Sequence, residues 1–173
     1  AQLEGAALIL AYHDPGALAE SLPSTTNNGS APWLAQIQKL NRGSSVAGGA
    51  AVLLGPFKGG PEAVVAAPTG PLNRDFDDVR RYSDAVAAGV KAVLAHGLAE
   101  GSPQPGRIVI ALQPPPETVD AASFSEYRIA ASLSALAELH VLPEVLEAAA
   151  LGSTRAISAM KAAKAIGEVV ITH

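Results

Sequence analysis

Residues 107–112 read Arg-Ile-Val-Ile-Ala-Leu, and three consecutive prolines follow at 114–116. A short run of apolar, mostly β-branched residues that ends at turn residues is typical of a strand buried on both faces. Similar runs occur at 8–12, 52–54 and 64–66. Because buried strands of this kind pack as a sheet between helices, the sequence predicts an α/β fold.

The longest helical pattern covers residues 76–98, where apolar side chains recur every three or four positions. Asn73 or Asp75 is expected to cap its start, and Gly97 to mark its end. One stripe of this helix is expected to face the sheet, and it consists of Phe76, Val79, Tyr82, Val86, Val90, Val93 and Leu94.

Further helices are expected at 32–40, which contains Trp33, and after Asp120 as a second long helix that Pro143 breaks. That long helix is expected to carry Phe124, Tyr127, Ala131, Leu136 and Leu139. Two helices over 144–151 and 153–166 and a strand over 167–173 would follow.

This order of elements predicts a three-layer α/β/α arrangement with a mixed, mostly parallel sheet. The strands at 52–54 and 64–66 are expected to be antiparallel neighbours, because their connection is too short for a helical crossover. We expect residues 1–152 to form a single α/β domain, and 153–173 to form a helical connection and the start of a following strand.

Composition excludes several classes of protein. The chain has 173 residues, of which 49% are hydrophobic and 16% charged, with a net charge of −4. Disordered chains have fewer apolar and more charged residues, so disorder is not expected. Nucleic-acid-binding proteins usually carry a basic surface, which the net negative charge does not indicate. Cysteine is absent, which excludes disulfides and thiolate catalysis. No apolar run approaches 18 residues, so no membrane span is expected. The first residues do not form a signal peptide as they stand, and the lack of an initiator Met indicates a processed or excised chain.

No catalytic constellation is evident in the sequence. The four histidines, at 13, 96, 140 and 173, are far apart and lack metal-ligand spacing. Asp75, Asp77 and Asp78 are best explained as acids in the first turn of a helix rather than as a cation site. The segment 55–61 is rich in glycine, but it lacks the residue order of a phosphate loop. Gly48-Gly49 is compatible equally with a close approach of the backbone to a ligand and with glycine tolerated before a strand. The sequence therefore predicts no catalytic, cofactor-binding or metal-binding residue.

The arrangement resembles the N-terminal domain of the cytosolic leucyl aminopeptidases, which are dizinc metallo-aminopeptidases. One part of the resemblance is an early strand, a polar loop, the helix with Trp33 and the strand Val52–Leu54. A second part is the strand with Val64-Val65, the long alanine-rich helix and the strand at 108–112. The third is the segment 147–155, which ends Leu-Gly-Ser-Thr-Arg where the family has an aromatic residue in place of Thr154.

The resemblance implies a macro-domain-like fold in a cytoplasmic metallopeptidase (hydrolase). It also implies that two zinc or manganese ions and the catalytic residues belong to a C-terminal catalytic domain of the same chain. The present domain would be non-catalytic, would bind no cofactor, and would contribute to oligomer assembly, as a homo-oligomer, and to active-site access. Nucleic acid and membrane are not among the expected partners. The alternative is a free-standing macro-like module that binds ADP-ribose or a related nucleotide, and an interaction domain without a ligand also remains open.

Overall fold

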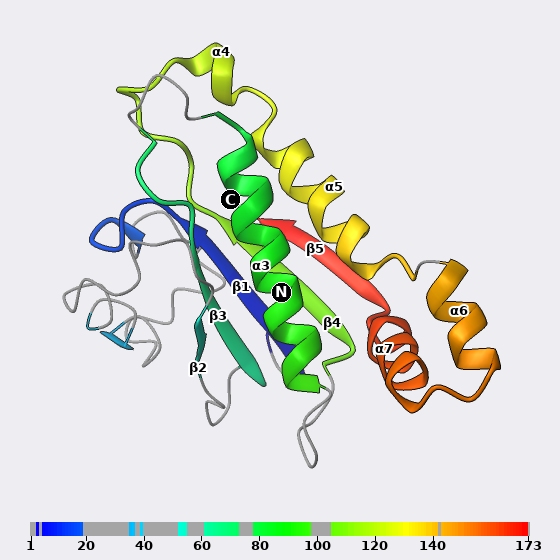
Figure 1. Ribbon diagram of the computed structural model, residues 1–173. Helices are drawn as coiled ribbons and strands as arrows, with labels where there is room; N and C mark the ends of the chain where they lie inside the picture. The colour runs from blue at the N-terminus through cyan, green and yellow to red at the C-terminus, as the bar shows by residue number, and fades with distance from the viewer. Residues whose placement is uncertain are drawn as a thin grey trace.

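The computed structural model describes residues 3, 5–18, 35–36, 39, 52–54, 61–72, 78–97, 105–141 and 143–172. Its five strands form one sheet in the order β2-β3-β1-β4-β5 (Figure 1). The neighbours β3, β1, β4 and β5 are parallel, whereas β2 is antiparallel to β3. The predicted α/β fold with a mostly parallel sheet and one antiparallel pair is therefore confirmed. The strands are β1 (Ala6–Tyr12), β2 (Val52–Leu54), β3 (Ala63–Pro68), β4 (Arg107–Leu112) and β5 (Glu168–Thr172).

Strand β1 is the centre of the sheet, and all seven of its residues are buried. Ile9 lies between Val65 of β3 and Ile110 of β4. Because successive side chains alternate between the two faces of a sheet, Ile9 belongs to one core cluster while Leu8 belongs to the other. Burial on both faces explains the unbroken apolar run at the start of the chain.

Helix α3 (Arg80–Gly97) packs across β1 and β3 on one face of the sheet (Figure 1). Val86, Val90 and Val93 are buried in the core between helix and sheet, which confirms their expected orientation. The helix begins later than residue 76, because Asp78 and Val79 are not helical and the Asp78 carboxylate accepts a hydrogen bond from the Arg80 N–H at 2.9 Å. The expected caps, Asn73 and Asp75, lie outside the described residues.

The opposite face of the sheet is equally buried. Its core cluster contains Leu8, Leu10 and Val109, with Leu18 and Leu3 packed against them. The expected helix at 32–40 belongs to the stretch 19–51, of which the structure describes only residues 35–36 and 39, all three of them helical. The rest of the expected third layer, with Trp33, lies outside the described residues.

The second long helix predicted after Asp120 is in fact two helices. Asp120 caps the short α4 (Ala121–Phe124) by accepting hydrogen bonds from two backbone N–H groups, and α5 (Tyr127–Leu139) begins after a break at residues 125–126. Helix α5 packs on α3 through its alanine side, since Ala131 and Ala135 permit a close approach. Leu136 lies off that side and is exposed.

The Leu-Gly-Ser segment joins α6 (Pro143–Ala150) to α7 (Thr154–Ala165). Gly152 has φ +87°, a conformation that favours glycine, and it ends α6. The Ser153 N–H donates back to the Ala148 carbonyl at 3.0 Å, while its hydroxyl accepts from the Ala156 N–H and caps α7. After α7, β5 pairs with β4 in the same sheet. Residues 153–172 thus add a strand to the sheet, although the sequence led us to separate them at Gly152.

One stretch of the described residues, Ala122–Ala150, is long and apolar enough to be counted as a candidate membrane span. In the structure it is divided among α4, α5 and α6. Helix α5 has 13 residues and is therefore about 20 Å long, shorter than the roughly 30 Å of a bilayer core.

Gly89 of α3 lies close against the sheet, and it provides a test of this packing. A Cβ atom at this position would lie 2.6 Å from Cγ2 of Ile9. Gly89→Ala should gain about 1 kcal/mol of helix propensity, yet we expect it to lower the free energy of unfolding by about 1–3 kcal/mol because the helix must move. Denaturant unfolding measures the change.

The double variant Ile9→Ala with Gly89→Ala should be more stable than the sum of the two single effects predicts, since Ile9→Ala removes the clashing methyl group. Gly106→Ala is the matched control, because nothing lies within 4 Å of a Cβ there. A Gly89→Ala variant as stable as the parent chain would show that helix and sheet are not in this close contact.

Candidate functional site at the carboxyl edge of the sheet

The carboxyl ends of β3, β1 and β4 meet at one edge of the sheet. From β1 the chain goes to β3 on one side, and α3 then carries it across to β4 on the other side. The strand order therefore reverses between β1 and β4. In open α/β sheets, ligands bind in the crevice at such a switch point, so this edge is the first place to look for a site.

Gln113 occupies this position, directly after β4. The residue is 3% exposed. Its Oε1 accepts hydrogen bonds from the backbone N–H groups of His13 and Asp14, both at 2.9 Å. Its Nε2 donates to the Asp14 carbonyl at 3.0 Å. The side chain thus pairs with the loop after β1 much as another strand residue would. It thereby joins the loop after β1 to the end of β4.

The backbone donors around this point are already engaged. In the loop after β1, the N–H groups of His13 and Asp14 donate to Gln113, and that of Gly16 donates to the Asp14 carboxylate at 2.7 Å. Pro15 has no N–H, and neither do the three prolines at 114–116. Phosphate groups bind α/β proteins through free backbone N–H groups, and none remains at 13–16 or 114–116.

Tyr82, in the first turns of α3, contacts the main chain of Gln113 from the helix side of the sheet. It is fully buried, and its hydroxyl donates to the Gln113 carbonyl at 2.8 Å. Its ring contacts Phe124 edge-on and lies 4.9 Å from the ring of Tyr127. Burial raises the pKa of Tyr82 above its ordinary value of 10.0, with a further contribution from Tyr127. Tyr82 therefore holds its proton and acts as a fixed donor.

Thr69, after β3, completes the described part of this edge. Its N–H donates to the Tyr12 carbonyl at 2.8 Å, and its buried hydroxyl lies within hydrogen-bond distance of the same carbonyl. His13 is the histidine nearest the switch point, and its Nε2 donates to the Pro114 carbonyl at 2.8 Å. The loops after all three strands are thus held to one another by hydrogen bonds within the protein.

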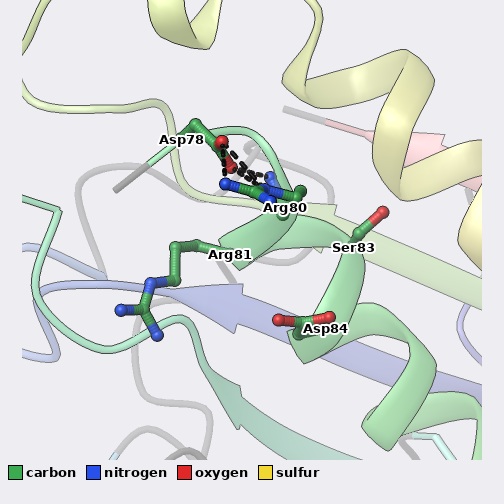
Figure 2. A pocket seen from close by; sticks show the side chains of 5 residues that line it. All are labelled: Asp78, Arg80, Arg81, Ser83 and Asp84. Carbon is green, nitrogen blue, oxygen red and sulfur yellow. Dashed lines mark hydrogen bonds and ion pairs between the residues drawn. The ribbon is translucent and has the colours of Figure 1, made fainter. Parts of the chain in front are cut away.

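A hollow of about 310 Å³ lies at the start of α3 and is lined by Asp78, Arg80, Arg81, Ser83 and Asp84. Figure 2 shows the Asp78 and Arg80 side chains turned toward each other, with an ion pair at 2.8 Å, while Arg81 points away from them. Hydrogen bonds from Arg80 lower the pKa of the Asp78 carboxyl. Ser83 donates to the Ala130 carbonyl at 3.0 Å and so belongs to the contact with α5. Asp78 is thus paired with an arginine, but it precedes α3 and does not lie in its first turn, where the sequence analysis expected it.

The remaining residues considered from the sequence are not brought together. His96 lies in the last turn of α3 and His140 follows α5. Gly48-Gly49, 55–60, Asp75, Asp77 and His173 lie outside the described residues. Within the described part of the chain, no three His, Asp or Glu side chains lie close enough to hold a metal ion. These residues therefore offer no ligand set for the two zinc or manganese ions that the resemblance implies.

Gln113 was missed in the sequence analysis. The only signal was a single polar residue between a buried strand and a run of prolines, and such a residue could equally have been exposed. Comparison with known proteins finds no family model, no curated protein and no solved structure that matches the chain.

Gln113→Ala tests whether this side chain holds the edge together. The substitution removes partners from two N–H groups and one carbonyl, so we expect a loss of about 2–3 kcal/mol in the free energy of unfolding, measured with denaturant. Glu117→Ala, on the exposed loop a few residues later, is the control and should change stability by less than about 0.5 kcal/mol. Equal effects of the two substitutions would contradict the role of Gln113.

Tyr82→Phe tests the buried hydroxyl and its titration. The lost hydrogen bond should cost about 1–2 kcal/mol at neutral pH. Unfolded Tyr82 loses its proton near pH 10, whereas the folded residue keeps it, so this group makes the parent chain progressively less stable as the pH rises above about 10. The variant should lose less stability than the parent between pH 9 and 11. Parallel pH curves for the two proteins would contradict the raised pKa.

Proposed function

We propose that this chain is a non-catalytic domain that acts through protein contacts, as the N-terminal domain of a cytoplasmic metallopeptidase of the leucyl aminopeptidase type. In this role it packs against a C-terminal catalytic domain of the same chain, contributes to a homo-oligomer and limits access to the active site. The observation that carries the proposal lies at the switch point, where Gln113 and Asp14 already accept hydrogen bonds from the backbone N–H groups that a ligand would need.

The alternative, a macro-like module that binds ADP-ribose or a related nucleotide, requires donors for a pyrophosphate. At the switch point the N–H groups of His13, Asp14 and Gly16 are already bonded within the protein. Binding a phosphate there would break those bonds and would also leave Gln113 Oε1 buried without a partner, which is costly. Asp14 adds a carboxylate beside the same loop. The described edge therefore favours a domain without a nucleotide.

The surface of the described residues supports a role in contacts. Large apolar side chains are exposed on α5, on α6 and in the turn after α6. Scattered exposed leucines are ordinary, but those on α5 lie along one line, and lines of apolar residues on a surface commonly mark interaction sites. The exposed residues are Ile129, Leu133, Leu136, Leu146 and Leu151.

The purified chain should not hydrolyse a leucyl anilide substrate, with or without added Zn²⁺ or Mn²⁺, because the residues that would bind the metals and the substrate belong to the catalytic domain in this proposal. Release of the chromophore measures turnover, and an intact leucyl aminopeptidase assayed in parallel serves as the positive control. Turnover that requires the metal and disappears with a chelator would contradict the proposal.

Two further measurements separate the proposal from its alternative. Calorimetric titration with ADP-ribose should give no binding heat, whereas a dissociation constant near 10 µM would establish the nucleotide-binding module instead.

The coding sequence should continue beyond residue 173 into a domain rich in metal-binding carboxylates. A stop codon directly after residue 173 would overturn the assignment to a larger peptidase.

A further inference from the structure

The outer side of α5 carries a regular apolar line. Ile129, Leu133 and Leu136 are 57%, 61% and 57% exposed, and their spacing of four and three residues places them on one side of the helix. The opposite side is fixed to α3, through Ala131 and Ala135 in the core and an ion pair of 3.1 Å between Lys91 and Glu138. Figure 1 shows α5 at the outer border of the helices on this face of the sheet. Its apolar line therefore has no partner among the described residues.

Two exposed polar residues end this line, and they have complementary chemistry. Glu126 precedes the first turn of α5 and His140 follows the last. Together with the three apolar residues they occupy positions 126, 129, 133, 136 and 140, which is the alternating four- and three-residue spacing of a coiled-coil seam. We call these five residues the α5 seam.

The two ends of the α5 seam are symmetric about its middle residue, and the apolar residues between them are symmetric to within one residue. Glu126 and His140 lie seven residues on either side of Leu133. If a second α5 packs antiparallel on the first, with the two-fold axis at Leu133, each Glu126 lies level with His140 of the other copy. Ile129 then lies within one residue, about 1.5 Å along the axis, of Leu136 in the other helix. A surface that matches itself in this way is what an isologous two-fold contact requires.

We propose that the α5 seam is a docking surface for a second copy of this chain, which binds it antiparallel with Leu133 at the two-fold axis. Each end of the contact joins the Glu126 carboxylate of one copy, as acceptor, to the His140 imidazole of the other. A parallel arrangement would instead place like residues together at each end and leave both pairs unmade. The inference rests on the proposed role in protein contacts and adds the partner and the surface.

Sedimentation equilibrium of the full chain tests this proposal. One helix pair buries less area than the 1,200–2,000 Å² of a stable interface, so we expect a weak dimer, with a dissociation constant on the order of 100 µM. Leu133→Glu should raise this constant by at least about ten-fold, because it places two like charges at the axis. Leu151→Glu, at a leucine that is 88% exposed but outside the seam, is the matched control and should change it by less than about two-fold.

A charge exchange tests the antiparallel arrangement itself. Glu126→Lys alone places a cation against His140 of the other copy, and His140→Glu alone places two carboxylates together. Each single variant should weaken the dimer by about three- to ten-fold, and the double variant should restore it to within about two-fold of the parent. Thermal melting checks that all variants fold, since both exchanges also affect the ends of the α5 dipole.

Several outcomes would overturn the proposal. The first is a chain that stays monomeric at 1 mM, including a monomer that instead sediments with phosphatidylcholine vesicles. The second is an equal effect of Leu133→Glu and Leu151→Glu on the dissociation constant. The third is a double charge-exchange variant whose dimer is as weak as the dimers of the two single variants. None of them bears on the anilide or ADP-ribose assays, so failure of this inference is distinguishable from failure of the proposed function.

Discussion

Strand β1 has parallel neighbours on both sides and is buried along its whole length, and the rest of the structure follows from this constraint. A parallel neighbour on each side requires helical crossovers, which cover the faces of the sheet. Alanine and glycine then let the covering helix approach closely: Gly89 of α3 lies directly over Ile9. The low aromatic content fits such thin layers, and the few rings of α3, α4 and α5 gather at the carboxyl edge around Tyr82.

The same constraint explains why the carboxyl edge needs Gln113. Where three parallel strands end together, the first residues after them leave the hydrogen-bond ladder while still close to the core. Buried backbone groups without partners are costly, and three prolines after β4 cannot supply donors. A glutamine can offer one acceptor oxygen to two N–H groups and one donor to a carbonyl. Along the described part of this edge, the N–H groups of His13, Asp14 and Gly16, which could bind a ligand, already donate hydrogen bonds within the protein.

Much of the fold could be predicted from the sequence because it depends on local patterns. Four strands, the antiparallel pairing of β2 with β3, and the buried side of α3 all followed from apolar runs, connection length and helical period. The break between α4 and α5 could not be predicted, because Asp120 is an equally good cap for a short helix as for a long one. Nor could the pairing of β5 with β4, since a partner more than 50 residues away in the chain leaves no local signal.

The candidate site could be predicted less well, and the reason is chemical. A catalytic site concentrates rare residue types with recognisable spacing, whereas a structural clamp uses one ordinary amide whose partners are backbone groups. Gln113 meets His13 and Asp14 across 100 and 99 residues, and the loop contributes only main-chain atoms to their hydrogen bonds with Gln113 Oε1. No pattern of side chains could reveal such a contact.

The two sides of the helical layer thus have opposite characters. Toward the sheet, the helices bury alanine and valine side chains together with the rings of Tyr82, Phe124 and Tyr127. Away from the sheet, α5 presents leucine and isoleucine where a solvated helix would carry charge. The exposed part of these side chains, more than half of each, contributes nothing to the stability of the single chain, because it buries no surface there. Their placement on one line, ended by an acid and a histidine, is therefore better explained by a contact outside the chain than by the packing within it.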